Sequence, residues 1–533
     1  MTRFVKLGAL CVAGVAQASG FYLGDNGAKA MLQGGAFTAQ ADDATAMQHN
    51  PAGLAQQPGF SFLADLQVLR HDVSFLRQDA SFDPANPSTA GINTVHNNPA
   101  PFLLPFFAAT YGFPLFGRTF TIGAGLFAPP SQGKYDYPVP NYLRNPTDPT
   151  RYLESPNKFS PQRYALTSNN IIIAYPTLSL AYDIHPRFQI GISAQLTLAE
   201  FVQSQSMFGG DSLCPSPTTC AADANSEFNP QRQRSEKGDY DATVSIDLPS
   251  RVGFTGILGV MARPTDWLSF GASVRPPIPF KGEGKMTLQL PALFTGAGAT
   301  VVGPKVAACL DASGNAIPGC YKGDANLVMT MPLEVKLGAR VTPIAGLGIN
   351  FDFVYNGWNS IDQLLLTPED ISLSSGPGAT PTAIAPFGLK KNWHATWSVR
   401  LGGTYQIFKY LSVSAGALYE TGAAPTSTYS VDWTHPTRFI FTGGVTGHLG
   451  PLDVIVGALF TPTVTTVVED SIVARGQTNP AITPGVVGTG IYTSGAWGLN
   501  FGVRGHFGAD APAAKPLFGA PSSAPASTSL ATP

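Results

Sequence analysis

The sequence predicts an all-β fold: a transmembrane β-barrel of about fourteen antiparallel strands, plugged by an N-terminal, partly helical hatch. Many segments alternate apolar and polar residues at a period of two, which gives each strand one oily and one polar face. No run of roughly 18 apolar residues is present that would cross a bilayer as a helix. Short and long connections alternate, which is the layout of barrels in bacterial outer membranes.

The composition excludes several other classes of protein. Only 12% of the 533 residues are charged, about half the usage of ordinary soluble domains. The formal net charge of −2 argues against nucleic acid as a partner. Mean hydropathy of +0.07 is too low for a bundle of transmembrane helices. A barrel accounts for both values, because it hides polar residues in its lumen.

The first element is a predicted signal peptide over residues 1–18. Arg3 and Lys6 give a basic start, residues 7–15 form a short apolar core, and Ala16-Gln17-Ala18 is an A-x-A cleavage site. The alternative, an anchor helix, requires a longer apolar core. Export to an oxidising compartment follows.

The predicted hatch covers residues 19–58. This segment does not alternate, is rich in Gly, Ala and small polar residues, and ends in a turn and helix-cap signal at Asn50-Pro51-Ala52. It favours short helices over strands.

The predicted barrel covers residues 59–507. Its clearest hairpin lies in 331–358, where Val335 and Phe351 fall on oily faces and Lys336 and Asp352 on polar ones. The expected strands are 59–76, 102–114, 118–128, 171–183, 187–203, 250–263, 266–289, the two strands of that hairpin, 392–406, 410–421, 436–448, 452–465 and 493–507. Aromatic residues near strand ends are expected in the interfacial girdles: Tyr182, Trp267, Tyr355, Trp358, Trp393, Tyr405, Tyr410, Tyr419 and Trp433.

The remaining segments are long loops and a tail. Two close cysteine pairs, Cys214/Cys220 and Cys309/Cys320, lie in loop sequence and are expected to form local disulfides, with cross-pairing as the alternative. Residues 508–533 are rich in Ala, Pro and Ser and are expected to be disordered.

Four stretches resemble the FadL/TodX family of outer-membrane transporters for hydrophobic compounds. These are SGFYLGDNGAKAMLQGGAFTAQADDATAMQHNPAGLA with its NPA motif, PTLSLAYDIHPRFQIGISAQL, GINFDFVYNGWNSID within 332–363, and NWHATWSVRLGGTYQIFKYLSVSAGALYETGAAP at 392–425. The resemblance implies a monomeric, multi-pass protein of the Gram-negative outer membrane that needs no cofactor. It implies passive uptake of long-chain fatty acids or similar hydrophobic compounds, or of aromatic hydrocarbons or alkanes. Departures from the family are the tail after Phe507 and the loop cysteines.

The resemblance also implies that a shift of the hatch releases the ligand sideways, through a kink in the third strand. Here that strand runs into Ala128, Pro129 and Pro130, and two prolines remove ladder donors. A plain strand end is the alternative.

Charged residues on the polar parity are expected in the lumen, because charge on the lipid face costs roughly 2–4 kcal/mol at midplane. They are Arg251, Arg275, Lys336, Arg340, Arg400, Arg438, Arg504, Glu334, Asp352, Glu420 and Asp453. They either brace the barrel and hatch or bind a ligand carboxylate, and Lys336 and Arg340 are the candidates for binding. Phe21, Leu32 and Phe37 of the hatch are candidates for an apolar pocket, or else pack the hatch into the barrel.

No catalytic or metal-binding set is apparent, since GxSxG and HExxH are both absent. A lipase-like barrel would need a Ser/His pair such as Ser398 and His394, which the alternation places on the lumen face. An open porin would have no hatch, and a secreted β-sandwich would not require detergent.

Overall fold

The computed structural model describes residues 24–78, 94–97, 99–128, 134–137, 143–145, 148–153, 160–208, 241–296, 298–374, 376–434, 436–474 and 486–508. The predicted signal peptide, nearly all of the predicted tail, Phe21, Pro129, Pro130, Cys214 and Cys220 lie outside these residues. Within the described residues, no helix is both long and apolar enough to cross a membrane.

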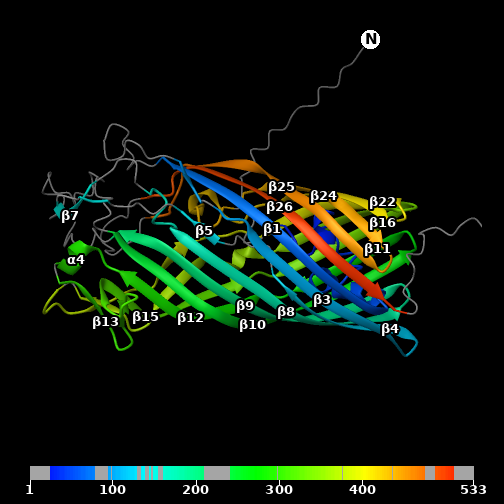
Figure 1. The fold of residues 1–533 in the computed structure, drawn as a ribbon, viewed down its shortest axis with the longest axis horizontal. Helices are drawn as coiled ribbons and strands as arrows, with labels where there is room; N and C mark the ends of the chain where they lie inside the picture. The colour runs from blue at the N-terminus through cyan, green and yellow to red at the C-terminus, as the bar shows by residue number, and fades with distance from the viewer. Residues whose placement is uncertain are drawn as a thin grey trace, which may run out of the picture.

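The strands close into an antiparallel ring with fourteen positions, as the alternation predicts (Figure 1). Ten positions hold one long strand each: β1 (Gly59–Arg77), β3 (Phe102–Leu115), β4 (Arg118–Phe127), β8 (Ser168–His185), β9 (Phe188–Phe208), β10 (Asp241–Thr265), β23 (Leu411–Glu420), β24 (Arg438–Leu449), β25 (Leu452–Val468) and β26 (Gly490–Phe507). Pairing of β26 with β1, from Phe60↔Phe507 to Arg77↔Gly490, closes the ring.

Four consecutive positions, between β10 and β23, hold two strand pieces each. The pairs are β11 (Leu268–Arg275) with β12 (Ile278–Gln289), β16 (Glu334–Ile344) with β15 (Ala316–Met331), β17 (Leu347–Asn356) with β18 (Gln363–Pro368), and β22 (Thr396–Phe408) with β21 (Phe387–Lys390). The breaks align, because Arg275, Glu334, Asn356 and Thr396 pair in one row across the sheet. The expectations of an unbroken strand over 266–289, and of a loop up to 323, were therefore wrong.

The alternation of faces is as predicted below these breaks. Phe351 and Trp397 are 46% and 41% exposed on the outer wall, whereas Asp352 and Ser398 are each 1% exposed and face the lumen. Above the breaks the inward parity changes on β11/β12 and β15/β16, because an irregular connection inserts residues between the two pieces.

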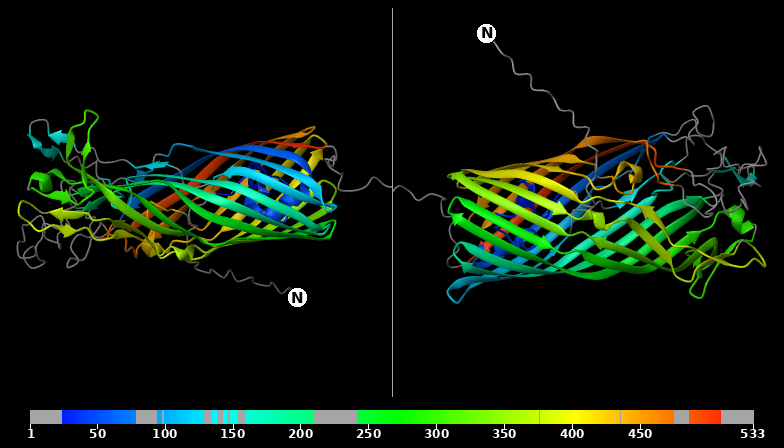
Figure 2. Two further views of the ribbon diagram at one scale, coloured as in Figure 1. Left: turned by 90° about the horizontal axis from the view of Figure 1, so that it is seen from below. Right: turned by 180° about the vertical axis from the view of Figure 1, so that it is seen from behind.

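The N-terminal segment 24–58 lies inside the barrel, in the half with the short turns (Figure 2). It contains α1 (Ala28–Met31), α2 (Ala46–His49) and the 3₁₀ helix η1 (Pro51–Gln56). The Asn50 side chain caps η1 by accepting a hydrogen bond from the Ala52 amide at 3.2 Å, and Pro51 occupies the first helical turn, where no donor is needed. This segment fills the lower lumen.

The long connections gather at the other end of the ring, where α4, β7 and β13 are labelled (Figure 1). The smaller elements are β2 (Val95–His96), β5 (Lys134–Asp136), β6 (Leu143–Asn145), β7 (Asp148–Leu153), α4 (Ala292–Gly296), β13 (Thr300–Val302), β14 (Ala307–Leu310), η5 (Trp358–Ser360), β19 (Ser372–Ser374), β20 (Thr382–Ala383) and η6 (Thr426–Thr428).

Two of these connections, 160–167 and 421–437, bury most of their described side chains over the upper lumen. Trp433 of the second connection stacks edge-to-face on Trp393, and Trp393 on Trp358, with ring centroids 5.8 and 5.6 Å apart. All three are at most 4% exposed, so their predicted place in a lipid-facing girdle was wrong. Trp267, Tyr405 and Tyr410 do lie exposed on the outer wall.

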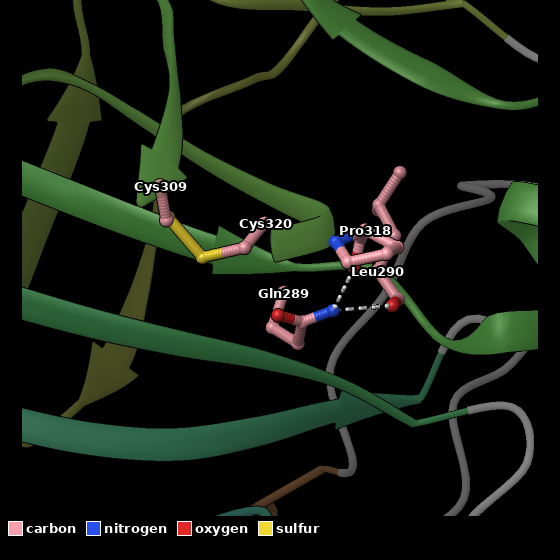
Figure 3. The surroundings of a disulfide bond; sticks show 5 residues. All are labelled: Gln289, Leu290, Cys309, Pro318 and Cys320. Atoms are coloured by element: carbon pink, nitrogen blue, oxygen red, sulfur yellow. Dashed lines mark hydrogen bonds between the residues drawn. A yellow bond between two sulfur atoms is a disulfide. The ribbon is translucent and has the colours of Figure 1, made fainter. Parts of the chain in front are cut away.

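A disulfide joins Cys309 of β14 to Cys320 of β15 (Figure 3). Beside it, the Gln289 amide group donates to the carbonyl oxygens of Leu290 at 3.1 Å and Pro318 at 3.0 Å. The Cys309–Cys320 disulfide therefore closes the β14–β15 hairpin in the long-loop half of the molecule.

Candidate binding site in the barrel lumen

The lower lumen is a seat in which wall side chains bind the segment 24–58. The Asp25 carboxylate accepts a hydrogen bond from Arg400 of β22, and its oxygens lie 3.9 Å from Lys336 Nζ and 3.8 Å from His49 Nε2. Arg400 also donates to the Gly35 carbonyl at 3.2 Å. Because both partners are almost fully buried, removing either one leaves a charge with no solvent to stabilise it.

Several wall side chains bind the backbone of the same segment. The Asp352 carboxylate accepts hydrogen bonds from the amides of Phe37 at 2.9 Å and Thr38 at 2.8 Å. Asn50 Nδ2 donates to the carbonyl oxygens of Thr38 and Val260, both at 2.9 Å, and so ties the NPA motif to β10. These bonds fix the position of the segment, because unpaired buried backbone groups are costly.

Neighbouring charges in the seat determine the protonation states of Asp25 and His49. Burial opposes ionisation of Asp25, yet the cations Lys336 and Arg400 hold the pKa of Asp25 well below its usual value. Burial lowers the pKa of His49, although Asp25 acts in the opposite direction. We therefore expect a charged Asp25 and a neutral His49 at neutral pH.

An apolar cavity lies above the seat. Its walls come from β9, β10, β15, β18 and β21 and from the 421–437 connection. The lining residues are Phe201, Gln203, Gln205, Ile246, Leu327, Leu364, Leu366, Phe387, Gly388 and Asp432. The free space, about 30 Å³, holds about two water molecules. Any larger ligand therefore has to displace lining side chains.

The acidic residue of this lining is already paired. The Asp432 carboxylate accepts hydrogen bonds from Lys391 Nζ and from the Ser430 hydroxyl, and both Lys391 and Asp432 are 1% exposed. Lys391 lies in the break between β21 and β22, so this ion pair ties the 421–437 connection to the wall. The cavity is thus apolar, with one neutralised pair at its edge.

The structure places the ligand-binding candidates elsewhere. Lys336 lies in the seat, 3.5 Å from Glu334 and 3.9 Å from Asp25. Arg340 lies on the same strand toward the short turn, pairing in register with Asn350. Leu32 packs against Ala28 and Ile455, and Phe37 makes an edge-to-face contact with His49 at 5.3 Å. None of the four lines the cavity described above.

The third strand stops at the predicted gate. β4 pairs with β3 as far as Phe107↔Leu126 and with β8 as far as Phe127↔Tyr175, and Ala128 follows outside any strand. Among the described residues, the next pair with β8 is Lys134↔Asn170 of β5. β4 therefore ends immediately before Ala128.

The enzyme alternative loses its candidate pair. Ser398 faces the lumen and accepts a hydrogen bond from Arg400 Nε at 3.2 Å, whereas His394 is exposed. The prediction that both share the lumen face was wrong, because the break at 391–395 separates His394 from the alternation of β22. Among the described residues, no group of three or more His, Cys, Asp or Glu side chains is placed to hold a metal ion.

Sequence reasoning missed the cavity and the Lys391–Asp432 pair. Both lie in segments read as loops or strand ends, where period-two alternation gives no information. The available signal was the density of apolar residues at 364–366 and of aromatic and hydroxyl residues at 428–434, which is unusual for exposed loops.

The closed ring, the apolar outer wall and the filled lumen define an outer-membrane β-barrel channel. A family profile described as "Outer membrane protein transport protein (OMPP1/FadL/TodX)" matches residues 153–483. The chain therefore belongs to the FadL/TodX family, whose members are β-barrel proteins of the Gram-negative outer membrane.

Solved structures share the fold. A FadL homologue from Pseudomonas aeruginosa has a TM-score of 0.62 and 15% identity, over 92% of this chain and 100% of the other. The Pseudomonas putida toluene transporter TodX has a TM-score of 0.60 and 14% identity, over 92% and 100%. For the Ralstonia pickettii toluene transporter TbuX the values are 0.57, 15%, 91% and 99%. No curated protein matches the sequence.

Proposed function

We propose that this protein is a passive uptake channel for long-chain fatty acids or comparable hydrophobic molecules. The observation that carries the proposal is the small apolar cavity in the upper lumen, above a lower lumen filled by segment 24–58. Hydrophobic ligands gain from such a cavity, because burying apolar surface contributes roughly 25 cal/mol per Å². A polar, water-filled porin lumen offers them no comparable site.

The proposed route has two steps. Ligand enters from the long-loop end and displaces side chains of the cavity, and a shift of the hatch then releases it sideways into the membrane. The end of β4 immediately before Ala128 supports lateral release, since a lateral opening requires wall backbone that is not paired in a continuous ladder. The seat around Asp25 and Asp352 supports a hatch held by a limited set of polar contacts that a shift would exchange.

A second candidate is a channel for aromatic hydrocarbons or alkanes. The lining of the described cavity contains no Lys or Arg, and its one acid is bound to Lys391. A neutral ligand fits this lining without disturbing the pair, whereas a carboxylate would have to replace Asp432 as the partner of Lys391. TodX and TbuX, which share the fold, are toluene transporters.

A substitution in the cavity tests the proposal. Leu366→Asn places a polar group in the apolar lining, and Leu365→Asn makes the same change on the opposite face of β18. Uptake of radiolabelled oleate and toluene by cells is expected to fall about tenfold for Leu366→Asn and to stay normal for Leu365→Asn. Equal uptake by both variants would show that ligands do not pass through this cavity.

A charge substitution separates the two candidates. Asp432→Asn keeps the shape of the side chain but leaves Lys391 without its carboxylate, so a fatty acid can take that place. For a fatty-acid channel, we expect oleate to bind the purified protein more tightly in this variant, while toluene binding is unchanged. Unchanged oleate binding assigns the cavity to neutral hydrocarbons.

A further inference from the structure

The wall between β10 and its neighbour at the seventh ring position is unpaired in its middle. β10 pairs with β11 as far as Leu258↔Val274, and pairing resumes with β12 only at Asp247↔Lys285. Both pairs belong to one register, so residues 248–257 and 275–284 face each other without strand pairing, although the backbone of both is described. We call these two stretches the seam.

Prolines explain why the ladder stops. The facing strand carries Pro276, Pro277 and Pro279, and β10 carries Pro249, which accompanies a register shift against β9 between Leu248 and Arg251. Each proline lacks the N–H that a ladder needs. Because lipid cannot satisfy backbone groups, barrel walls otherwise keep continuous ladders at membrane depth. The interruption is therefore built into both strands.

Apolar side chains close the seam. Leu248, Ile278 and Phe280 are 0%, 2% and 5% exposed. Leu248 rests on two glycines of β12: a Cβ at Gly284 would lie 2.6 Å from Leu248 Cδ2, and one at Gly282 would lie 3.1 Å from Cδ1. When an apolar ligand displaces Leu248 from these glycines, one set of apolar contacts replaces another. This displacement breaks no hydrogen bond between β10 and β12.

The outer side of the seam faces lipid near the upper limit of the apolar wall. Val252 and Phe254, on the outward face of β10, are 68% and 71% exposed. Farther up the facing strand, the exposed residues are charged, with Lys281 and Glu283 on the outward face of β12. This change from apolar to charged residues places the seam at the level of the outer leaflet.

The inner side of the seam borders the apolar cavity. Ile246 lines the cavity and lies two residues before Leu248 on the same inward face of β10. Leu327, another lining residue, is the register partner of Gly282 on β15. One buried side chain, Leu248, thus stands next to both the cavity and the unpaired wall.

We propose that the seam is a second lateral portal, gated by Leu248, through which apolar molecules pass between the upper cavity and the outer leaflet. It lies between the sixth and seventh ring positions, away from the end of β4 at the third position. The inference rests on the proposed function, because the cavity supplies the ligand. Its consequence is that ligand reaches lipid without passing the hatch.

A cross-link tests the portal. A Cβ at Gly253 would lie 3.4 Å from Ile278 Cγ2, so the pair Gly253→Cys and Ile278→Cys is close enough for a disulfide that locks the seam. The matched control is Ala262→Cys with Phe270→Cys, which joins the same strands where their ladder is intact. Heat-modifiable electrophoretic mobility checks that each variant is folded, and wild type is measured with and without reductant.

We expect the seam lock to lower oleate and toluene uptake at least fivefold, with recovery on reduction, while the control lock leaves uptake unchanged. Leu248→Ala is expected to raise uptake about twofold or more by widening the seam. If neither variant changes uptake while Leu366→Asn abolishes it, the portal is wrong and the channel function stands. If Leu366→Asn also has no effect, the proposed function itself fails.

Discussion

Replacing Asp352 by Ala removes a carboxylate that binds two consecutive amides of the hatch. The Asp352 side chain accepts from the amides of Phe37 and Thr38 at 2.9 and 2.8 Å, and it is 1% exposed. Water does not readily replace it there. Each buried N–H left without an acceptor costs about 1–3 kcal/mol, so we take about 3 kcal/mol for the pair. Because every 1.4 kcal/mol is a factor of ten, the detached hatch becomes about a hundredfold more populated.

Hydrogen exchange measures this change directly. In detergent-solubilised protein, the peptide that contains Phe37 and Thr38 is expected to exchange about a hundredfold faster in Asp352→Ala than in wild type. Val354→Ala is the control, because it shortens a buried, apolar side chain on the same face of the same strand. If Asp352→Ala exchanges at the wild-type rate while remaining folded, the reasoning about the seat is refuted.

Three further predictions concern the hatch and the loops. Burial lowers the pKa of His49, so its side chain takes up a proton only when the hatch detaches. Amide hydrogen exchange of the hatch should therefore accelerate as pH falls below about 6.5. The His49→Gln variant should abolish this pH dependence. Asn50→Ala loses two bonds of 2.9 Å, to Thr38 and Val260, and the cap bond from the Ala52 amide. It should speed amide hydrogen exchange of the NPA region at least tenfold, and exchange at the wild-type rate would assign the motif no anchoring role. Cys309→Ser should cost about 3 kcal/mol locally, visible as proteolysis of the β14–β15 hairpin with unchanged barrel mobility, and barrel unfolding would contradict this.

The fold was predictable because alternation and turn length are local properties of the chain. The hairpin around Lys336 and Phe351 shows both, and the structure keeps its faces as predicted. The candidate site was less predictable. Trp393 shares its parity with Trp397, yet the break at 391–395 turns Trp393 inward. Such a break depends on how neighbouring strands pair, which the local pattern does not record.

By itself, the sequence determined the number of ring positions, the outward apolar face and the inward charges, because a period of two assigns each side chain to lipid or lumen wherever a strand is regular. Only the tertiary structure decided what those inward groups do. It brought Asp25 to Arg400, 375 residues apart, and folded the 421–437 connection into the lumen so that Asp432 meets Lys391. It also left residues 248–257 of β10 without strand pairing to the seventh ring position, beside three prolines. These contacts join segments distant in sequence, and only closure of the ring fixes which segments face each other.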